Sequence, residues 1–376
     1  MNARWLLCAF FTFVLGLSAC NSSETPVQDT GLAVLAQHAD SYAQARPGQP
    51  MIFPRDHGAH PDYRIEWWYL TANLNDADGN NFGIQWTLFR LAVQPPDERE
   101  PGDTGMDDQV FMAHFAVSTE DDHMSFQRYA RGGQDPDISR VGVTAEPFSA
   151  YLDDWALQST SSNWLPLEVK ASQDETSMHL QLQSSKPLIL QGDNGFSQKH
   201  PQGGGSFYYS QPFLKASGDL IVNGQNIPVS GEAWLDREWS SQFLQGSQVG
   251  WDWFSIHLAN GEKLMIFQLR EGQDESQAGN FLHGSLISPD GGTISLDPAQ
   301  IKIKVVQRIE VAGRALPLKW SMNLPQIQRS FEIETLHPDQ WLEVDFPYWE
   351  GVIIVTGQGP QNSGRGYMEL TGYPAR

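Results

Sequence analysis

The feature of this sequence that most constrains its fold is a series of short segments in which apolar and polar residues alternate. Between these segments lie pairs of residues that favour tight turns, namely Asp78-Gly79, Asn223-Gly224, Asn260-Gly261 and Asp290-Gly291. Successive side chains of a strand point to opposite faces, and Asn-Gly or Asp-Gly pairs suit the turns of hairpins. We therefore expect strands at Trp67–Leu74, Phe82–Leu91, Met112–Ser118, Met178–Gln183, Lys263–Arg270, Ile301–Val311 and Trp341–Asp345.

The same pattern excludes several other folds. The sequence contains no helical heptads and no Gly-rich phosphate loop, which argues against a doubly wound nucleotide-binding fold. At 376 residues the chain is too long for one typical core, so two domains are expected. Regularly spaced short strands with hairpin turns then predict an all-β protein built from sandwiches or antiparallel barrels.

An internal similarity supports two related halves. Trp67–Leu91 and Trp251–Arg270 each begin with neighbouring tryptophans, reach a leucine seven positions later, turn at a glycine and end near an arginine. A weaker similarity connects Ser230–Asp236 with Arg365–Tyr373. Aromatic hairpins resemble one another in general, and that is the alternative explanation. A duplicated β unit would place the junction near residues 240–250.

The N-terminus predicts export and lipid anchoring. A basic start is followed by an apolar run that is short for a membrane span and ends in Leu17-Ser18-Ala19-Cys20, as a lipoprotein signal does. We expect a signal peptide at residues 1–19, lipid attachment at Cys20 and a tether at residues 20–50 with one short helix at Gly31–Gln44. The predicted location is the bacterial cell envelope, anchored in the outer membrane and facing the periplasm.

The composition limits the kinds of molecule that the protein can bind. The net charge is −21, and a nucleic-acid-binding protein would need the opposite sign, so no nucleic acid is expected. Hydrophobic residues make up 40% of the chain, which is ample for packed cores.

The segment Gly231–Phe243, GEAWLDREWSSQF, departs from ordinary barrel packing because acids, a base and indoles crowd into a strand end. Alternation places Trp234, Asp236 and Glu238 on one face of the strand and Arg237 on the other. This cluster is either a functional site or an ion-pair network that closes the corner between two domains.

Five segments lie in order along the chain: Phe53–Leu74, Met112–Ser118, Gly231–Gln242, Gly250–Leu258 and Gly364–Tyr373. Together they resemble the AttH-like, carotenoid-hydratase-like family of exported bacterial proteins. The resemblance implies two tandem lipocalin-like antiparallel β-barrels, which we place at residues 51–240 and 241–376. It also implies an apolar ligand, lipid or polyene, with acyclic carotenoid hydratases and partners of ABC-transporter permeases among the relatives.

The resemblance also assigns roles to residues. Hydratases have an aspartate where this chain has Asp236, which implies that Asp236 is the proton donor, with Trp234 and Tyr209 in aromatic positions beside it. A buried acid can protonate a C=C bond, and aromatic faces stabilise the resulting cation. This chain departs from the hydratases at Phe207, where they have a histidine two residues before the aromatic, and this departure favours a binding protein over an enzyme.

Further candidates come with alternatives of their own. Glu66 is a second carboxyl or the partner of Arg237, and His114 is a general base or a core histidine. His57 and His60 have a metal-like spacing, but without further ligands we predict no metal and no cofactor. No Gly-x-Ser-x-Gly motif occurs, which argues against a serine hydrolase. The remaining candidate ligand-binding residues are His60, Trp67, Trp68, Trp251 and Trp253.

Two functions therefore remain open from the sequence. The first is a lipoprotein that binds an apolar ligand in or between its barrels, accessory to an ABC-type export system. The second is a hydratase or isomerase that adds water to a C=C bond of an apolar substrate, with Asp236 as its acid.

Overall fold

The computed structural model describes residues 39–100, 108–133, 139–242, 244, 247–272 and 279–375. Within these ranges the chain forms antiparallel strands and short 3-10 turns, with no α-helix, so the all-β prediction is confirmed. No helix in the described ranges is long and apolar enough to cross a membrane. Cys20 and most of the predicted tether lie outside the described residues. The 3-10 turns are Ala39–Ser41, Arg55–His57, Pro96–Glu98, Pro298–Gln300, Pro325–Ile327 and Pro360–Asn362.

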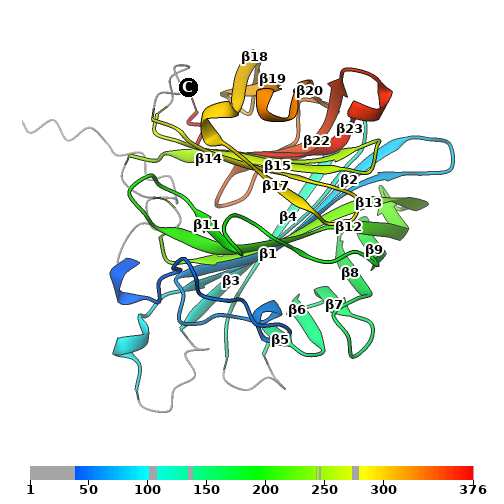
Figure 1. Ribbon diagram of the computed structural model, residues 1–376. Coiled ribbons are helices and arrows are strands. Elements are labelled where there is room, and N and C mark those ends of the chain that lie inside the picture. Colours follow the sequence, from blue (N-terminus) through cyan, green and yellow to red (C-terminus); the bar gives the residue numbers. More distant parts are fainter. Residues whose placement is uncertain are drawn as a thin grey trace, which may run out of the picture.

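The first sheet follows the order β4-β3-β2-β1-β13-β12-β9-β8-β7-β6-β5, with β10 and β11 added beside β12. Its two ends approach each other, and Arg128 of β4 stacks over Trp155 of β7 at 4.3 Å, so the sheet forms a nearly closed barrel (Figure 1). Its strands are β1 (Ile65–Asn75), β2 (Asn81–Ala92), β3 (Gln109–Ser118), β4 (His123–Arg131), β5 (Val141–Ala145), β6 (Phe148–Leu152), β7 (Trp155–Ser159), β8 (Leu167–Gln173), β9 (Thr176–Gln183), β10 (Ile189–Leu190), β11 (Phe196–Gln198), β12 (Gly205–Val222) and β13 (Gln225–Ser240).

The second sheet follows the order β17-β16-β15-β14-β23-β22-β20-β19-β18, with β21 beside β22, and forms a half-barrel. In Figure 1 it lies above the first sheet, in yellow to red. Its strands are β14 (Gly250–Leu258), β15 (Lys263–Arg270), β16 (Phe281–Ile287), β17 (Thr293–Leu296), β18 (Lys302–Val311), β19 (Arg314–Leu324), β20 (Arg329–Thr335), β21 (Trp341–Leu342), β22 (Tyr348–Gly357) and β23 (Gly364–Leu370).

The strand register repeats between the two sheets, as the internal similarity predicts. In the first sheet β1 pairs with β13, and Leu74 stands opposite Gly231. In the second sheet β14 pairs with β23, and Leu258 stands opposite Gly364 in the same relation. The motifs that resemble each other in the sequence therefore occupy equivalent positions in the two sheets.

The described residues form four apolar clusters, and three of them fill the spaces inside and between the two sheets. One core fills the first barrel and includes Trp68, and a second fills the half-barrel and includes Phe254. The third lies between the sheets and joins Tyr69 and Trp234 of the first sheet to Trp253 of the second. The outer face of the first barrel thus packs on the outer face of the half-barrel, and this contact positions the candidate site.

Most of the predicted strands agree with the structure within two or three residues at either end. The exception is Trp341–Asp345, because only Trp341–Leu342 is a strand. Pro347 follows the apolar residues of this segment, and the chain bends before β22 begins at Tyr348. Leu342 stands opposite Tyr348, so residues 343–347 form the loop that connects β21 to β22, and this is why the strand ends at Leu342.

Candidate functional site

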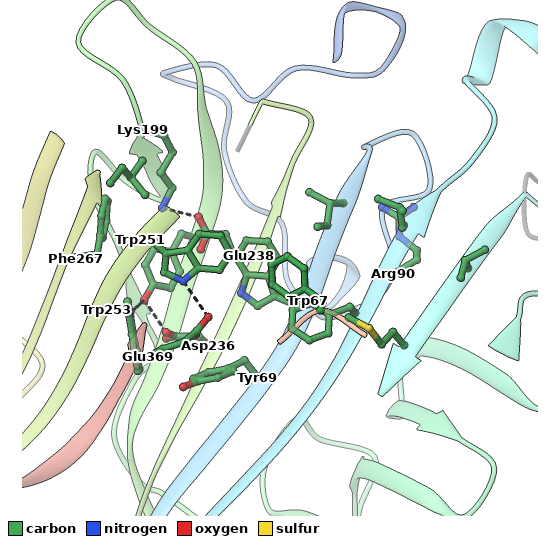
Figure 2. Close-up of a pocket in the computed structure, with 18 of the residues that line it drawn as sticks. Trp67, Tyr69, Arg90, Lys199, Asp236, Glu238, Trp251, Trp253, Phe267 and Glu369 are labelled. Atoms are coloured by element: carbon green, nitrogen blue, oxygen red, sulfur yellow. Dashed lines mark hydrogen bonds and ion pairs between the residues drawn. The ribbon is translucent and has the colours of Figure 1, made fainter. Parts of the chain in front are cut away.

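A cavity of about 310 Å³ lies between the two sheets, outside the interior of either barrel. Its walls are mainly aromatic and aliphatic, and carboxyl groups stand at one end (Figure 2). Both sheets contribute, since β1, β2, β3, β12 and β13 face β14, β15 and β23. The lining residues are Ile65, Trp67, Tyr69, Phe89, Arg90, Leu91, Val110, Met112, Tyr129, Lys199, Tyr208, Asp236, Glu238, Trp251, Trp253, Phe267, Leu269, Asp345, Phe346 and Glu369.

Asp236 lies on β13 with its side chain toward this cavity and is buried. Three groups donate hydrogen bonds to its carboxyl: the Tyr208 hydroxyl at 2.6 Å, the Ser210 hydroxyl at 2.5 Å and Trp234 Nε1 at 2.7 Å. Trp253 Nε1 of the second sheet donates in turn to the Tyr208 hydroxyl at 3.2 Å. The orientation of Asp236 is therefore fixed by three partners from the first sheet, one of which, Tyr208, is itself held by the second sheet.

Burial raises the pKa of Asp236 from 3.8 to about 7. The hydrogen bonds from Ser210, Tyr208 and Trp234 oppose this rise, and the nearby charge of Glu238 adds to it. A carboxyl with a pKa near neutrality can both give and take a proton under physiological conditions, which is what general acid–base catalysis requires.

Glu238 stands two residues further along β13, on the same face as Asp236. Its carboxyl accepts a hydrogen bond from Ser206 and forms an ion pair with Lys199 Nζ at 2.7 Å. The Lys199 ammonium also lies 4.2 Å from the centre of the Phe267 ring. This end of the cavity therefore combines a buried ion pair with aromatic faces that attract cations.

Glu369 of β23 reaches the cavity from the second sheet, as Figure 2 shows. Its carboxyl accepts a hydrogen bond from Trp251 Nε1 at 2.9 Å. Burial, together with the charges of Asp236 and Glu238, raises its pKa from 4.5 to about 8, against the opposing effect of the Trp251 hydrogen bond. Glu350 stands opposite Glu369 on β22, and burial together with the charge of Glu369 raises the Glu350 pKa well above its ordinary value.

The face of β13 that points into the first barrel carries an ion-pair network. The Arg237 guanidinium lies 2.7 Å from Glu66 and stacks over the Trp68 ring at 3.8 Å. Arg90 pairs with the same carboxyl. Burial by itself would raise the pKa of Glu66, but the charges of Arg90 and Arg237 outweigh it and hold the pKa well below its usual range. Glu66 is therefore an ionised partner of two arginines.

Alternation along β13 places Asp236 and Arg237 on opposite faces, as predicted. Four candidate residues, however, lie on the face that carries Arg237 and points into the first barrel. Glu66 and Trp68 belong to that network, and His60 stacks on the Trp239 ring at 3.9 Å. Tyr209 forms a 2.7 Å hydrogen bond with His57 Nδ1. None of the four lines the cavity. The expectation that Tyr209 flanks Asp236 is wrong because Ser210 is opposite Asp236 in the β12–β13 register, which turns Tyr208 to the cavity and Tyr209 away from it.

Phe207 shares the face of Tyr209 and packs with Trp239 at the end of the first barrel. The residue type at this position therefore does not alter the walls of the cavity between the sheets. The departure from the hydratase pattern thus concerns a packed end of the barrel and bears less on the cavity than the sequence suggested.

The remaining candidates lie at or near the interface between the sheets. Trp67, Trp251 and Trp253 line the cavity, and Trp234 is buried behind Asp236. His114 also faces the second sheet, where its Nδ1 forms a 2.8 Å hydrogen bond with the Tyr348 hydroxyl. Burial lowers the pKa of His114 to about 3, so the imidazole is neutral, but it is not among the lining residues.

His57 and His60 do not build a metal centre. The His57 ring stacks on Trp164 at 3.8 Å, whereas His60 contacts Asp56 and Glu66. Within the described ranges no group of three or more histidine, cysteine, aspartate or glutamate side chains is arranged to hold a metal ion.

Tyr208, Lys199 and Glu369 are among the cavity residues that the sequence analysis missed. Glu369 could have been found, because aligning Gly231–Asp236 with Gly364–Glu369 places it at the position of Asp236. Tyr208 depends on the register of β12. Lys199 precedes this strand in a loop, and no pattern in the sequence shows which way it points.

The fold and the cavity define a class of β protein in which a nearly closed barrel and a half-barrel enclose a largely apolar site with buried carboxyl groups. The sequence profile of the AttH-like family matches residues 44–373, and the chain belongs to this family. No curated protein sequence matches the chain.

Solved structures agree with this assignment. A protein from Nitrosomonas europaea assigned as AttH shares 35% sequence identity, with a TM-score of 0.76 over 88% of this chain and 100% of that one. Kievitone hydratase from Nectria haematococca shares 16% identity, with a TM-score of 0.61 over 89% of this chain and 97% of that one. CghA in complex with Sch210972 shares 13% identity, with a TM-score of 0.56 over 90% and 97%. These last two similarities concern the fold.

Proposed function

We propose that the cavity between the sheets binds an apolar, unsaturated small molecule. The observation that carries this proposal is the composition of the walls, which include Trp67, Phe89, Met112, Trp253 and Phe267. Enclosed apolar cavities with a few fixed polar groups are typical of small-molecule sites. The carboxyls at one end would orient the ligand, and the aromatic faces would contact its apolar body.

A second candidate function is hydration or isomerisation of a C=C bond in that ligand. It is favoured by Asp236, a buried carboxyl held by three hydrogen bonds at the edge of an apolar space. A proton delivered there would create a carbocation beside the rings of Trp253 and Tyr208, which would stabilise it. The similarity in fold to kievitone hydratase is compatible with this chemistry.

We also propose that the mature protein is a lipoprotein, attached through Cys20 to the outer membrane and facing the periplasm. The motif Leu17-Ser18-Ala19-Cys20 supports this proposal. An apolar ligand is poorly soluble in water, so a carrier or enzyme close to a membrane would receive it directly. In this setting an ABC-type permease is a suitable partner.

The binding proposal can be tested with retinol, a polyene whose absorption overlaps tryptophan emission. Retinol bound near Trp67, Trp251 and Trp253 should accept energy from these tryptophans. Tryptophan fluorescence should therefore fall, and retinol fluorescence should appear when tryptophan is excited. Val110→Trp places an indole inside the cavity and should weaken binding at least tenfold. The matched control is Val306→Trp, on an exposed strand of the half-barrel, which should bind as the parent does. Equal binding by both variants would refute the site.

A further inference from the structure

The cavity contains two buried carboxyls that come from opposite sheets, Asp236 of β13 and Glu369 of β23. We propose that they work as an acid–base pair in which Glu369 donates the proton and Asp236, as the carboxylate, receives one. This inference rests on the hydratase-type function proposed above and reverses the role that the family resemblance implies for Asp236.

The hydrogen-bond donors around the two groups differ. Asp236 accepts hydrogen bonds from Tyr208, Ser210 and Trp234, whereas within the described residues Glu369 accepts one, from Trp251. Donors directed at a carboxyl stabilise its charged form. The geometry therefore prepares Asp236 to hold the negative charge and leaves Glu369 less able to do so.

The surroundings of Glu369 favour its neutral form. Glu350 faces it across β22 and β23, and burial together with the charge of Glu369 raises the Glu350 pKa more than the hydroxyls of Tyr69 and Tyr348 lower it. The hydroxyls of Tyr69 and Tyr348 are the polar neighbours of Glu350. From β13, Asp236 and Glu238 add negative charge, and the nearby cation Lys199 is paired with Glu238.

A cluster of this kind must retain protons. Several buried carboxyls cannot all be ionised at short range, so protons stay on those with the fewest stabilising donors. Glu350 and Glu369 meet this description. The order of the two cavity carboxyls agrees with it, because burial raises the pKa of Glu369 to about 8 and that of Asp236 to about 7.

The reaction balances with water as the second reactant. The Glu369 hydroxyl gives its proton to one alkene carbon, and the π electron pair forms the new C–H bond. The cation left on the other carbon is attacked by a water oxygen while the Asp236 carboxylate takes a proton from that water. Glu369 ends as a carboxylate and Asp236 as an acid, and transfer of one proton from Asp236 back to Glu369 restores the starting state.

Infrared spectroscopy can test the assignment without a substrate, because protonated carboxyls have a C=O stretching band apart from that of carboxylates. The band of the full mature chain is recorded at slightly alkaline pH. Glu369→Gln should remove the intensity of one carboxyl, whereas Asp236→Asn should leave the intensity undiminished. Asp345→Asn, an exposed carboxyl at the cavity mouth, is the matched control and should change nothing.

Loss of the band in Asp236→Asn with retention in Glu369→Gln would overturn the proposal. If Glu369→Gln fails to fold, the Asp236→Asn spectrum still decides, since an undiminished band supports the proposal and a diminished band refutes it. This result is independent of the retinol experiment. If retinol does not bind but the infrared spectra are as expected, the proposed function is rejected, whereas the assignment of protons to Glu369 and Asp236 still holds.

Discussion

Asp236 and Glu369 occupy equivalent positions in two related strand pairs and line the same cavity. Asp236 stands opposite Tyr69 in the β1–β13 register, and Glu369 stands opposite Trp253 in the β14–β23 register. Each acid therefore has an aromatic cross-strand neighbour that also lines the cavity. Because the two sheets pack through these equivalent faces, a repeated sequence motif supplies both walls of one site.

The ion-pair network inside the first barrel should be essential for stability. Glu66→Gln leaves Arg90 and Arg237 buried without their carboxylate, which should cost about 3–5 kcal/mol of the free energy of unfolding. Urea denaturation measures this loss. The control Arg140→Gln removes an exposed pair with Asp153 and should leave the denaturation midpoint nearly unchanged. A small effect of Glu66→Gln would show that the network is dispensable.

The stability of the protein should fall as the pH rises from mildly acidic to neutral. The pKa of Asp236 is raised from 3.8 to about 7, so in this interval the unfolded chain releases the proton that the folded chain retains. The contribution is complete below pH 3.8 and is lost as the pH rises through about 7. Asp236→Asn should reduce this loss by a few kcal/mol, measured by denaturation at a series of pH values. An unchanged pH profile would contradict the assignment.

Gly364 should be irreplaceable in the second sheet. A Cβ atom at this position would lie 2.0 Å from the His257 carbonyl oxygen, and one at the equivalent Gly231 would lie 2.0 Å from that of Asn73. Backbone atoms of a paired strand cannot move aside, so Gly364→Ala should destabilise the protein by about 1–3 kcal/mol or more. Thermal denaturation tests this. Gly313→Ala, in the turn before β19, serves as a comparison. A Cβ atom at Gly313 would contact no other atom, so the cost in stability should come only from the positive φ of this residue.

The anchor prediction concerns Cys20. Cys20→Ala should yield a protein without lipid that leaves the membrane fraction, since the only other cysteine, Cys8, lies within the predicted signal peptide. Cell fractionation and intact-protein mass spectrometry measure the outcome. A variant that stays with the membrane at unchanged mass would show that the anchor is elsewhere.

Much of the fold follows from alternation and turn chemistry. These two patterns identify strands such as β1, β2 and β15, and they place Asp236 and Arg237 on opposite faces of β13. The length of β21 was overestimated, because alternation within the segment does not show where the loop to β22 begins.

The site was harder to predict because it depends on how the sheets pack. Alternation within one strand assigns faces, but it does not show which face meets the other sheet. Tyr208 and Tyr209 exchange roles through the register of β12 with β13, and that register is a property of pairing. His60 and Glu66 belong to motifs that resemble the family, yet they stabilise Arg237 on the far side of the strand.

The most direct test of a ligand site between the sheets is a crystal structure of the protein with bound retinol. We predict electron density for the polyene in the cavity, against Trp67, Phe89 and Phe267, with its polar end toward Asp236 and Glu369. Density inside the first barrel among Trp68 and its neighbours, or on the outer surface with an empty cavity, would contradict the account.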